Sequence, residues 1–390
     1  MSEPGPLGDD PFANIPFLGD LMRLLGQQGS FSWEAARQLA HSVATEGRAE
    51  PNIDPAVRFH YQQLARVAEL HVQQATGLDL TMSGRSLEVV PVTPSMWAHR
   101  TLEAYRPLFE QLSSSLGSAG PAVPPADAAD LMSSLVAMMA PTMVGLGIGT
   151  MVGQLARRSF GQYDLPIPRP PSHELLVVPH AIDGFADDWS LPPDDLKLWV
   201  CVHELTSHAV LAVPHVRDEL QRLLARYAGG FRPDTTSFDE RLDSLNMTGQ
   251  GLPDLQRLFG DPSFLLGAVR TTEQQGLLVQ LDALVAVIVG YVDHVLDGVS
   301  TGLVGSAGRI SEAVRRRRLE DDQSAKYVGQ LLGMTITQSQ VERGARFVGG
   351  IVERAGDDSL GRLWRGPREL PTPAEVDAPG LWLARIELPD

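Results

Sequence analysis

One histidine–glutamate pair in the middle of the chain has the residue types needed for metal-assisted hydrolysis. His203 is followed directly by Glu204 inside the apolar segment WVCVHELTSHAVL, residues 199–211. In the pattern H-E-x-x-H, two histidines four residues apart share one helix face and bind zinc, and the glutamate acts as general base on the metal-bound water. His203 and Glu204 therefore match the first ligand and the catalytic base of this pattern.

The second histidine of the pattern is displaced by one residue. Ser207 stands at the fifth position, and the next histidine is His208. On an ideal helix of 3.6 residues per turn, His208 lies about 140° around the axis from His203. His208 can share a metal with His203 only if a π-bulge absorbs the extra residue. Otherwise replacement ligands are needed, such as His215 or Asp293.

Two other side chains of the segment are weak candidates for a nucleophile. Cys201 lies about 200° around the helix from His203, so we expect a packed core thiol rather than a nucleophile–base pair. Ser207 has neither the G-x-S-x-G turn of a serine nucleophile nor an obvious oxyanion hole.

Two helices must position these residues. Pro193 suits the first helical position and Pro214 ends the pattern, which predicts a helix over residues 194–213. Overlapping capping boxes in the sequence TTEQQ open a second helix over residues 272–297. The best strand candidate is Leu175–Ile182, where we expect His180 to be exposed at the strand end.

The rest of the chain divides at one clear linker. Residues 113–127 are rich in Pro, Ser and Gly, and separate a helical region at 12–112 from a main domain at 128–390. Residues 1–11 are expected to be disordered. Further helices are predicted at 308–331 and 336–356. Since little strand pattern is present, the predicted fold class is mostly α with a small β-sheet (α+β).

The composition limits which metal sites the chain can form and which partners it can bind. The chain has 390 residues, one cysteine, and 48 acidic against 32 basic side chains, for a net charge of −16. A single cysteine excludes disulfides and cysteine-based metal clusters within one chain, so histidines and carboxylates must hold any metal. The acidic surplus argues against a nucleic-acid partner. We interpret the one basic run, Arg315–Arg318, as a solvated helix face because acidic residues follow it.

Neither a membrane segment nor an export signal is expected. The N-terminus MSEPGPLGDDPF lacks the basic and apolar regions of a signal peptide, which favours a cytoplasmic location. The uncharged stretch at 131–156 is long enough to span a bilayer, but Pro141 interrupts it. Gly145, Gly149 and Gly153 share one helix face there, so we expect buried helices packed closely against a neighbour.

The sequence on both sides of the histidine helix resembles that of a known protein family. The chain resembles the actinobacterial zincin-like metallopeptidases, a family described as hydrolases or as proteins associated with deazaflavin-coenzyme biosynthesis. The segments that carry the resemblance are PFLGDLMRLL, MWAHRTLEAYRPLFEQL, GQYDLPIP, LLVVP, HAIDGFADDWSLPPDDLKLWVCVHELTSH, GYVDHVLD, LLGMTITQSQVERGARFVGGIVERAG and LWRGPRELPTPAEVDAPGLWLARI. Together they run from about residue 12 to residue 386. The resemblance implies a zincin-like fold for residues 128–390, with zinc as cofactor and peptides as substrates.

The resemblance also implies a ligand set of two histidines and one glutamate. It maps the first ligand to His203, the base to Glu204, the second ligand to Ser207 and the third ligand to Val289 on a second helix. Two of the three expected ligand positions are therefore replaced in this chain.

One supporting carboxylate of such sites is retained. Asp293 lies four residues after Val289, at the spacing of an aspartate that orients the first histidine, so we expect it to hydrogen-bond His203. His294 points about 100° away from Asp293 and is expected at the surface or in an interface.

The favoured interpretation is a pseudo-peptidase that has lost zinc binding and acts by binding a peptide or protein partner. The alternative is an active zinc-dependent metalloprotease that uses His203, Glu204 and a shifted His208. If the first interpretation holds, Ser207→His combined with Val289→Glu should create zinc binding.

Overall fold

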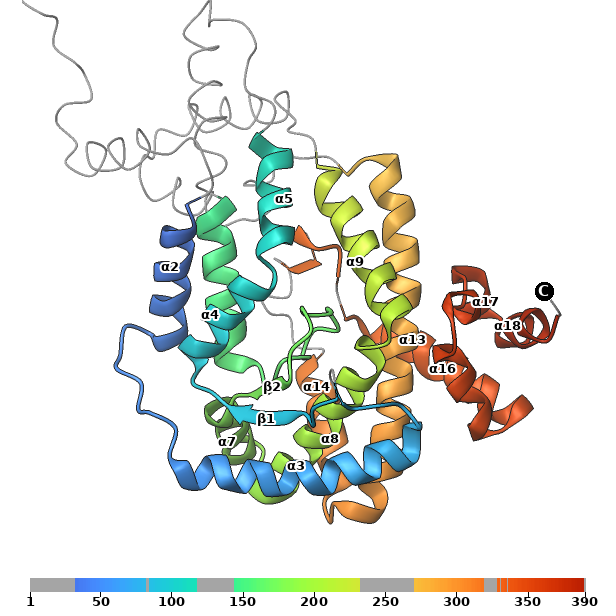
Figure 1. The fold of residues 1–390 in the computed structure, drawn as a ribbon, viewed down its shortest axis with the longest axis horizontal. Coiled ribbons are helices and arrows are strands. Elements are labelled where there is room, and N and C mark those ends of the chain that lie inside the picture. Colours follow the sequence, from blue (N-terminus) through green and yellow to red (C-terminus); the bar gives the residue numbers. More distant parts are fainter. Residues whose placement is uncertain are drawn as a thin grey trace, which may run out of the picture.

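The computed structural model describes residues 32–81, 84–117, 144–231, 270–318, 328–329, 331–334 and 336–388. Most of them are helical, and two short strands form the sheet, which confirms the predicted fold class (Figure 1). The first half contains α2 (Trp33–Thr45), α3 (Pro55–Thr76), β1 (Glu88–Pro91), α4 (Pro94–Ala104), α5 (Arg106–Gly117), β2 (Glu174–Val177) and α7 (Pro179–Asp188). The second half contains α8 (Pro193–Leu211), α9 (Pro214–Gly229), α13 (Thr272–Leu303), α14 (Ala307–Arg318), α16 (Gln338–Ala355), η1 (Asp357–Trp364), η2 (Pro367–Glu369), α17 (Pro373–Asp377) and α18 (Pro379–Ile386).

Helix α8 is the central helix of the fold and carries the histidine–glutamate pair. Its bounds confirm the predicted helix at 194–213 to within two residues, with Pro193 at the first turn and acidic residues beside it. Every residue from Trp199 to Leu211 is buried. Such a helix must be covered on all sides, and α3, α7, α13 and α14 pack around it. Polar side chains on α8 therefore need partners inside the protein.

Helix α13 is longer than predicted but begins at the predicted place. The Thr271 side chain accepts from the Gln274 backbone, and the Gln274 side chain accepts from the Thr271 backbone, which completes the capping box. Within the described residues, α13 is long and apolar enough to cross a membrane, and a sharply bent pair, α8 with α9, passes the same test when counted as one span. Most of the apolar stretch of α13 is buried against α8, α9 and α16, and this packing accounts for its composition.

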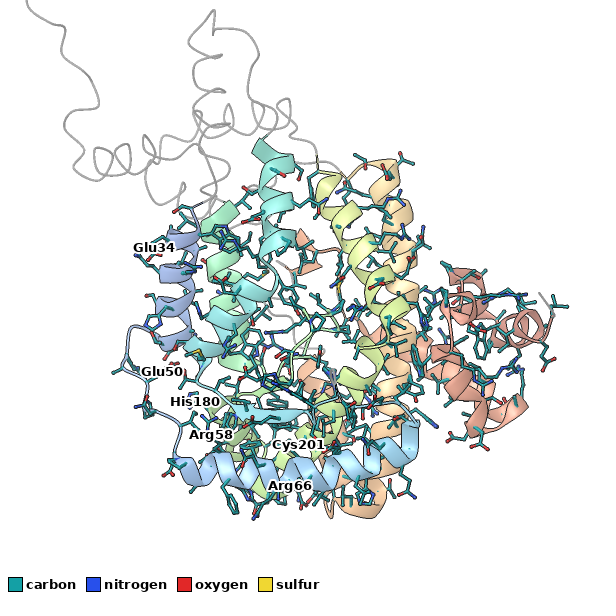
Figure 2. The ribbon with its side chains drawn as sticks, in the orientation of Figure 1. Glu34, Glu50, Arg58, Arg66, His180 and Cys201 are labelled. Carbon is teal, nitrogen blue, oxygen red and sulfur yellow. The ribbon has the colours of Figure 1, made fainter. Side chains whose placement is uncertain are left out.

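The sheet joins two parts of the chain that lie far apart in sequence. Strand β1 pairs in parallel with β2, from Glu88 opposite Glu174 to Pro91 opposite Val177. The predicted strand at 175–182 is wrong at its end, because Pro179 starts α7 directly after the strand. His180 is exposed as expected, but in the first turn of α7 rather than on a strand (Figure 2).

The predicted close packing of small residues is confirmed where the structure describes it. In the helix at 144–158, a Cβ on Gly149 would lie 2.5 Å from the Ala36 carbonyl oxygen of α2, and one on Gly153 would lie 2.8 Å from that of Ala40. Residues 113–117, predicted to begin the linker, instead end helix α5. The rest of the linker, the tail at 1–11 and residues 131–143 lie outside the described residues.

Candidate functional site

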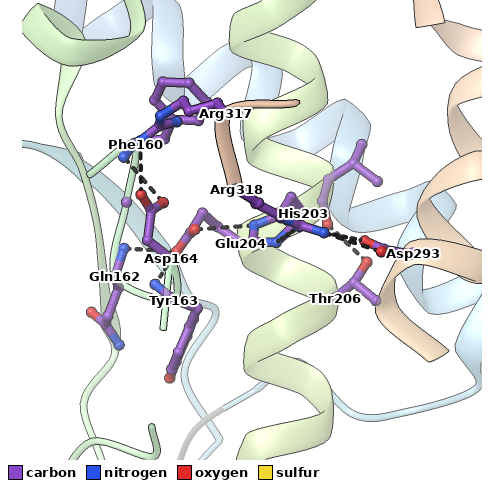
Figure 3. Close-up of polar contacts among 12 residues, drawn as sticks. Phe160, Gln162, Tyr163, Asp164, His203, Glu204, Thr206, Asp293, Arg317 and Arg318 are labelled. Carbon is purple, nitrogen blue, oxygen red and sulfur yellow. Dashed lines mark hydrogen bonds and ion pairs between the residues drawn. The ribbon is translucent and has the colours of Figure 1, made fainter. Parts of the chain in front are cut away.

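The site is built around two buried polar side chains of α8. The side chain of Glu204 is entirely buried and that of His203 is 11% exposed. His203 Nδ1 lies 3.2 Å from Glu204 Oε1, and the His203 ring stacks on that of Trp199, with the ring planes within 6°. Figure 3 shows the two side chains leaving the helix in different directions. Each of them meets a different segment of the chain.

Glu204 is held by the backbone of the segment GQYDLPIP. Its Oε2 accepts from the amides of Gln162 at 2.7 Å and Tyr163 at 2.9 Å (Figure 3). A Cβ on Gly161 would lie 2.4 Å from Glu204 Cδ, so only glycine fits there. Trp97 of α4 fixes this segment by donating to the Gly161 carbonyl at 2.8 Å. Burial raises the pKa of Glu204, and the bonds from His203 and Tyr163 oppose that rise.

His203 faces an arginine on its other side. Arg318 Nη2 lies 3.2 Å from His203 Nε2, and Arg318 Nη1 donates to both oxygens of Asp293, at 2.9 and 3.1 Å (Figure 3). The expected hydrogen bond between Asp293 and His203 is therefore wrong: Arg318, from the end of α14, lies between them. Burial disfavours the charge on Arg318, but the Asp293 carboxylate outweighs it and the pKa of Arg318 is raised.

The donor properties of arginine fix the tautomer of His203. A guanidinium has only N–H donors and stays protonated. His203 Nε2 must therefore accept from Arg318, which leaves the proton of the neutral ring on Nδ1, where it is donated to Glu204. The ring keeps the tautomer of a metal-binding histidine, with a guanidinium at the nitrogen where a metal would bind.

His208 belongs to a different hydrogen-bonded pair. Helix α8 is a regular α-helix throughout, without the π-bulge that a shared site with His203 requires. His208 Nδ1 is hydrogen-bonded to the Tyr163 hydroxyl at 3.0 Å, and burial lowers its pKa to about 4. Ser207 is buried on α8 and Val289 is buried on α13.

His294 and Cys201 lie where the sequence places them. His294 is partly exposed on α13, where its Nε2 is 2.6 Å from Asp357 Oδ1. Cys201 is a buried free thiol whose pKa is raised by burial. Neither side chain contributes to the polar network of His203.

The basic run is half solvated and half built into the site. Arg315 and Arg316 pair with Glu312 at the surface, as predicted. Arg317 and Arg318 point inward, so the interpretation of the whole run as a solvated face is wrong for these two residues. Successive helical residues are about 100° apart. Four consecutive arginines therefore cannot all share one face, and this spacing was the signal available in the sequence.

These residues do not fit a zinc ion. Catalytic zinc takes three protein ligands, and of the three mapped positions only that of His203 holds a ligand-type side chain. Zinc would bind about 2.0 Å from a histidine nitrogen, in the gap where Arg318 donates to Nε2. Among the described residues, no group of three or more His, Cys, Asp or Glu side chains is arranged to hold a metal ion.

A family model and a solved structure are both similar to this chain. A family model described as zincin-like metallopeptidase matches residues 31–383. A search of curated proteins finds no match. One similar solved structure comes from Chloroflexus aurantiacus and is provisionally assigned as a hydrolase with a novel fold. It is 23% identical, covers 92% of this chain and 100% of its own, and superposes with a TM-score of 0.64.

Proposed function

This chain belongs to the zincin-like metallopeptidase family, and from that premise we propose that it is a pseudo-peptidase. In this proposal the guanidinium of Arg318 takes the place of the zinc ion. The protein then acts by binding a peptide or protein partner rather than by hydrolysing one.

The observation that carries the proposal is the contact between Arg318 and the imidazole of His203. The Nε2 lone pair that would bind zinc accepts a hydrogen bond from Arg318 at 3.2 Å. Arg318 is itself held by two hydrogen bonds to Asp293, the carboxylate that the family pattern places beside the first histidine. Zinc binding at this nitrogen is disfavoured for two reasons. The lone pair already accepts a hydrogen bond, and the positive charge of the guanidinium repels a second cation.

The environment of Glu204 also supports a site without hydrolysis. A general base must lie within hydrogen-bond reach of the water that it activates. Glu204 is fully buried, and its two oxygens accept from His203 and from two backbone amides. In this arrangement Glu204 holds the segment at 160–164 against α8, which is a structural role.

Zinc content and peptide hydrolysis test this proposal on the full-length protein. We expect purified protein to carry far less than one zinc per chain, and to gain neither zinc nor caseinolytic activity after incubation with excess zinc. Glu204→Gln is the matched control, because this change abolishes hydrolysis in a working zinc peptidase and should leave both the zinc content and the caseinolytic activity unchanged here.

The alternative predicts the opposite results. About one tightly bound zinc per chain, together with hydrolysis that a chelator and Glu204→Gln both remove, would establish an active metalloprotease and overturn the proposal. Such a result would favour ligation through His203 and a shifted His208.

A further inference from the structure

Two hollows meet beside the His203 site, and the same residues line their junction. The inner hollow has a volume of about 100 Å³ and is lined in part by His203, Trp199 and Arg318. The outer hollow has a volume of about 580 Å³ and lies over α7. Arg158, Phe160 and Arg317 line both hollows. The two hollows are therefore neighbours that have these three residues in common.

The inner hollow combines positive charge with an apolar wall. Among the described residues, three arginines line it, Arg158, Arg317 and Arg318, against one acidic residue, Asp164. This concentration of arginine stands out in a chain with a net charge of −16. The remaining wall is largely aliphatic, formed by Leu155, Leu165, Val314, Val328, Met334 and Ile336. The lining therefore suits a ligand with one negative charge and an aliphatic group.

Arg317 has N–H groups directed to no protein acceptor in the described part of the chain. Both of its hydrogen bonds, to the Arg158 carbonyl and to Asp164, are made by Nη2. Its guanidinium carbon lies over the Phe160 ring, 3.6 Å from the ring centroid, a contact that helps to hold the side chain in place. Burial lowers the pKa of Arg317, so an additional anion at its free edge would compensate a desolvated charge. A guanidinium edge held in this way matches the two oxygens of a carboxylate.

We propose that the junction of the two hollows binds the C-terminal carboxylate of a peptide that ends in an aliphatic residue. The carboxylate lies between Arg317 and Arg158, the last side chain enters the inner hollow, and the preceding residues follow the outer hollow over α7. This inference names the ligand class of the proposed binding function and rests on that function.

The outer hollow distinguishes a peptide from a free aliphatic acid. A free acid of similar size fills the inner hollow alone, whereas a peptide also covers Phe185, Trp189 and His180 in the outer hollow. Contacts to these aromatic and polar side chains add affinity that a free acid cannot gain. A peptide with a free C-terminus is therefore expected to bind more tightly than a free aliphatic acid.

Calorimetric titration of the full-length protein at low salt provides the test. The probe is N-acetyl-Ala-Ala-Leu with a free C-terminus, compared with the same peptide as its C-terminal amide and with 4-methylpentanoate. We expect the free acid peptide to bind at least about tenfold more tightly than the amide, because a charge-assisted hydrogen bond is lost. We also expect it to bind more tightly than 4-methylpentanoate.

Arginine variants locate the binding site. Arg317→Gln should weaken binding of the free acid peptide about tenfold or more, and Arg158→Gln should weaken it as well. Arg316→Gln is the matched control, because Arg316 lies one residue away and pairs with Glu312 at the surface. Circular dichroism shows whether Arg317→Gln folds. If it does not, the comparison of the free acid peptide with the amide peptide on the wild-type protein still tests the proposal.

Four results would overturn the proposal. They are equal affinity for acid and amide peptides, no binding of either at millimolar concentration, inorganic phosphate binding as tightly as the peptide, and 4-methylpentanoate binding as tightly as the peptide. Each is independent of zinc content, so a zinc-free protein that ignores the peptide overturns the pocket assignment and leaves the loss of zinc intact.

Discussion

His203 and Arg318 form the contact on which the chemistry of the site depends. In a metal site, a histidine nitrogen donates its lone pair to a dication and the other ring N–H is held by a carboxylate or carbonyl. Here Glu204 holds the Nδ1 proton and Arg318 donates to Nε2. In the proposed pseudo-peptidase, a side chain with one positive charge and fixed N–H directions replaces an ion that needs several deprotonated ligands. In that proposal Asp293 balances the charge of Arg318, so that no ligand is needed at Ser207 or Val289.

His208 makes the stability of the protein sensitive to acid. Burial lowers its pKa to about 4 in the folded state, against about 6.5 in the unfolded state. Between these values the unfolded state binds more protons, so the stabilisation is complete above about pH 6.5 and is lost as pH falls toward 4. The full loss is on the order of 3 kcal/mol. Urea denaturation from pH 7 to pH 4.5 measures most of this loss, which is complete only below the folded-state pKa of about 4.

The matched variant for this measurement is His208→Gln, which keeps a polar partner for Tyr163 and removes the titrating ring. The difference in unfolding free energy between wild type and variant should shrink as pH falls. Glu204 acts in the opposite direction, since its raised pKa gives stability that is lost as pH rises, but it is present in both proteins. A difference that does not change with pH would contradict this account of His208.

Three elements have to meet before the site exists. Helix α8 supplies His203 and Glu204, the end of α14 supplies Arg318, and α13 supplies Asp293. Their approach depends on the packing of α13 against α8 on one side and α16 on the other. Gly290 of α13 and Gly344 of α16 allow these two helices to pack closely, because a Cβ on Gly290 would lie 2.4 Å from the Gly344 backbone.

Gly290→Ala should therefore destabilise the fold by about 1–3 kcal/mol, since the added methyl group meets backbone rather than a movable side chain. Gly298→Ala on the same helix is the control. A Cβ there has no neighbour within 4 Å, so alanine should be neutral or stabilising by up to about 1 kcal/mol. Thermal unfolding of both variants measures the contrast, and equal stability of the two would refute close α13–α16 packing.

The same elements show what a sequence can and cannot predict. Caps and apolar periodicity placed α8 and the start of α13, because those signals are local. Strand β2 was predicted too long, because Pro179 can either continue an apolar run or start a helix. The inward position of Arg318 was missed because its partner His203 is 115 residues away. Only packing of the whole chain brings them together.

At the scale of the whole molecule, one core joins the regions that the sequence separates. Buried residues from Ala40 of α2 to Trp382 of α18 belong to a single apolar cluster. Arg317 and Arg318 bring positive charge to this core, paired with Asp164 and Asp293. Composition predicted the absence of a cysteine metal cluster, but gave no indication that an inward arginine completes the site.

Zinc affinity of two designed variants tests the replacement of metal by arginine most directly. From the sequence alone, Ser207→His with Val289→Glu should create zinc binding. Because these changes restore the ligand set but leave Arg318 at Nε2, we instead expect weak or undetectable zinc binding. Adding Arg318→Met should make binding at least about a hundredfold tighter, because a like charge about 4 Å away costs on the order of 4 kcal/mol. Equal zinc affinity of the double and triple variants, whether tight or undetectable, would contradict the account.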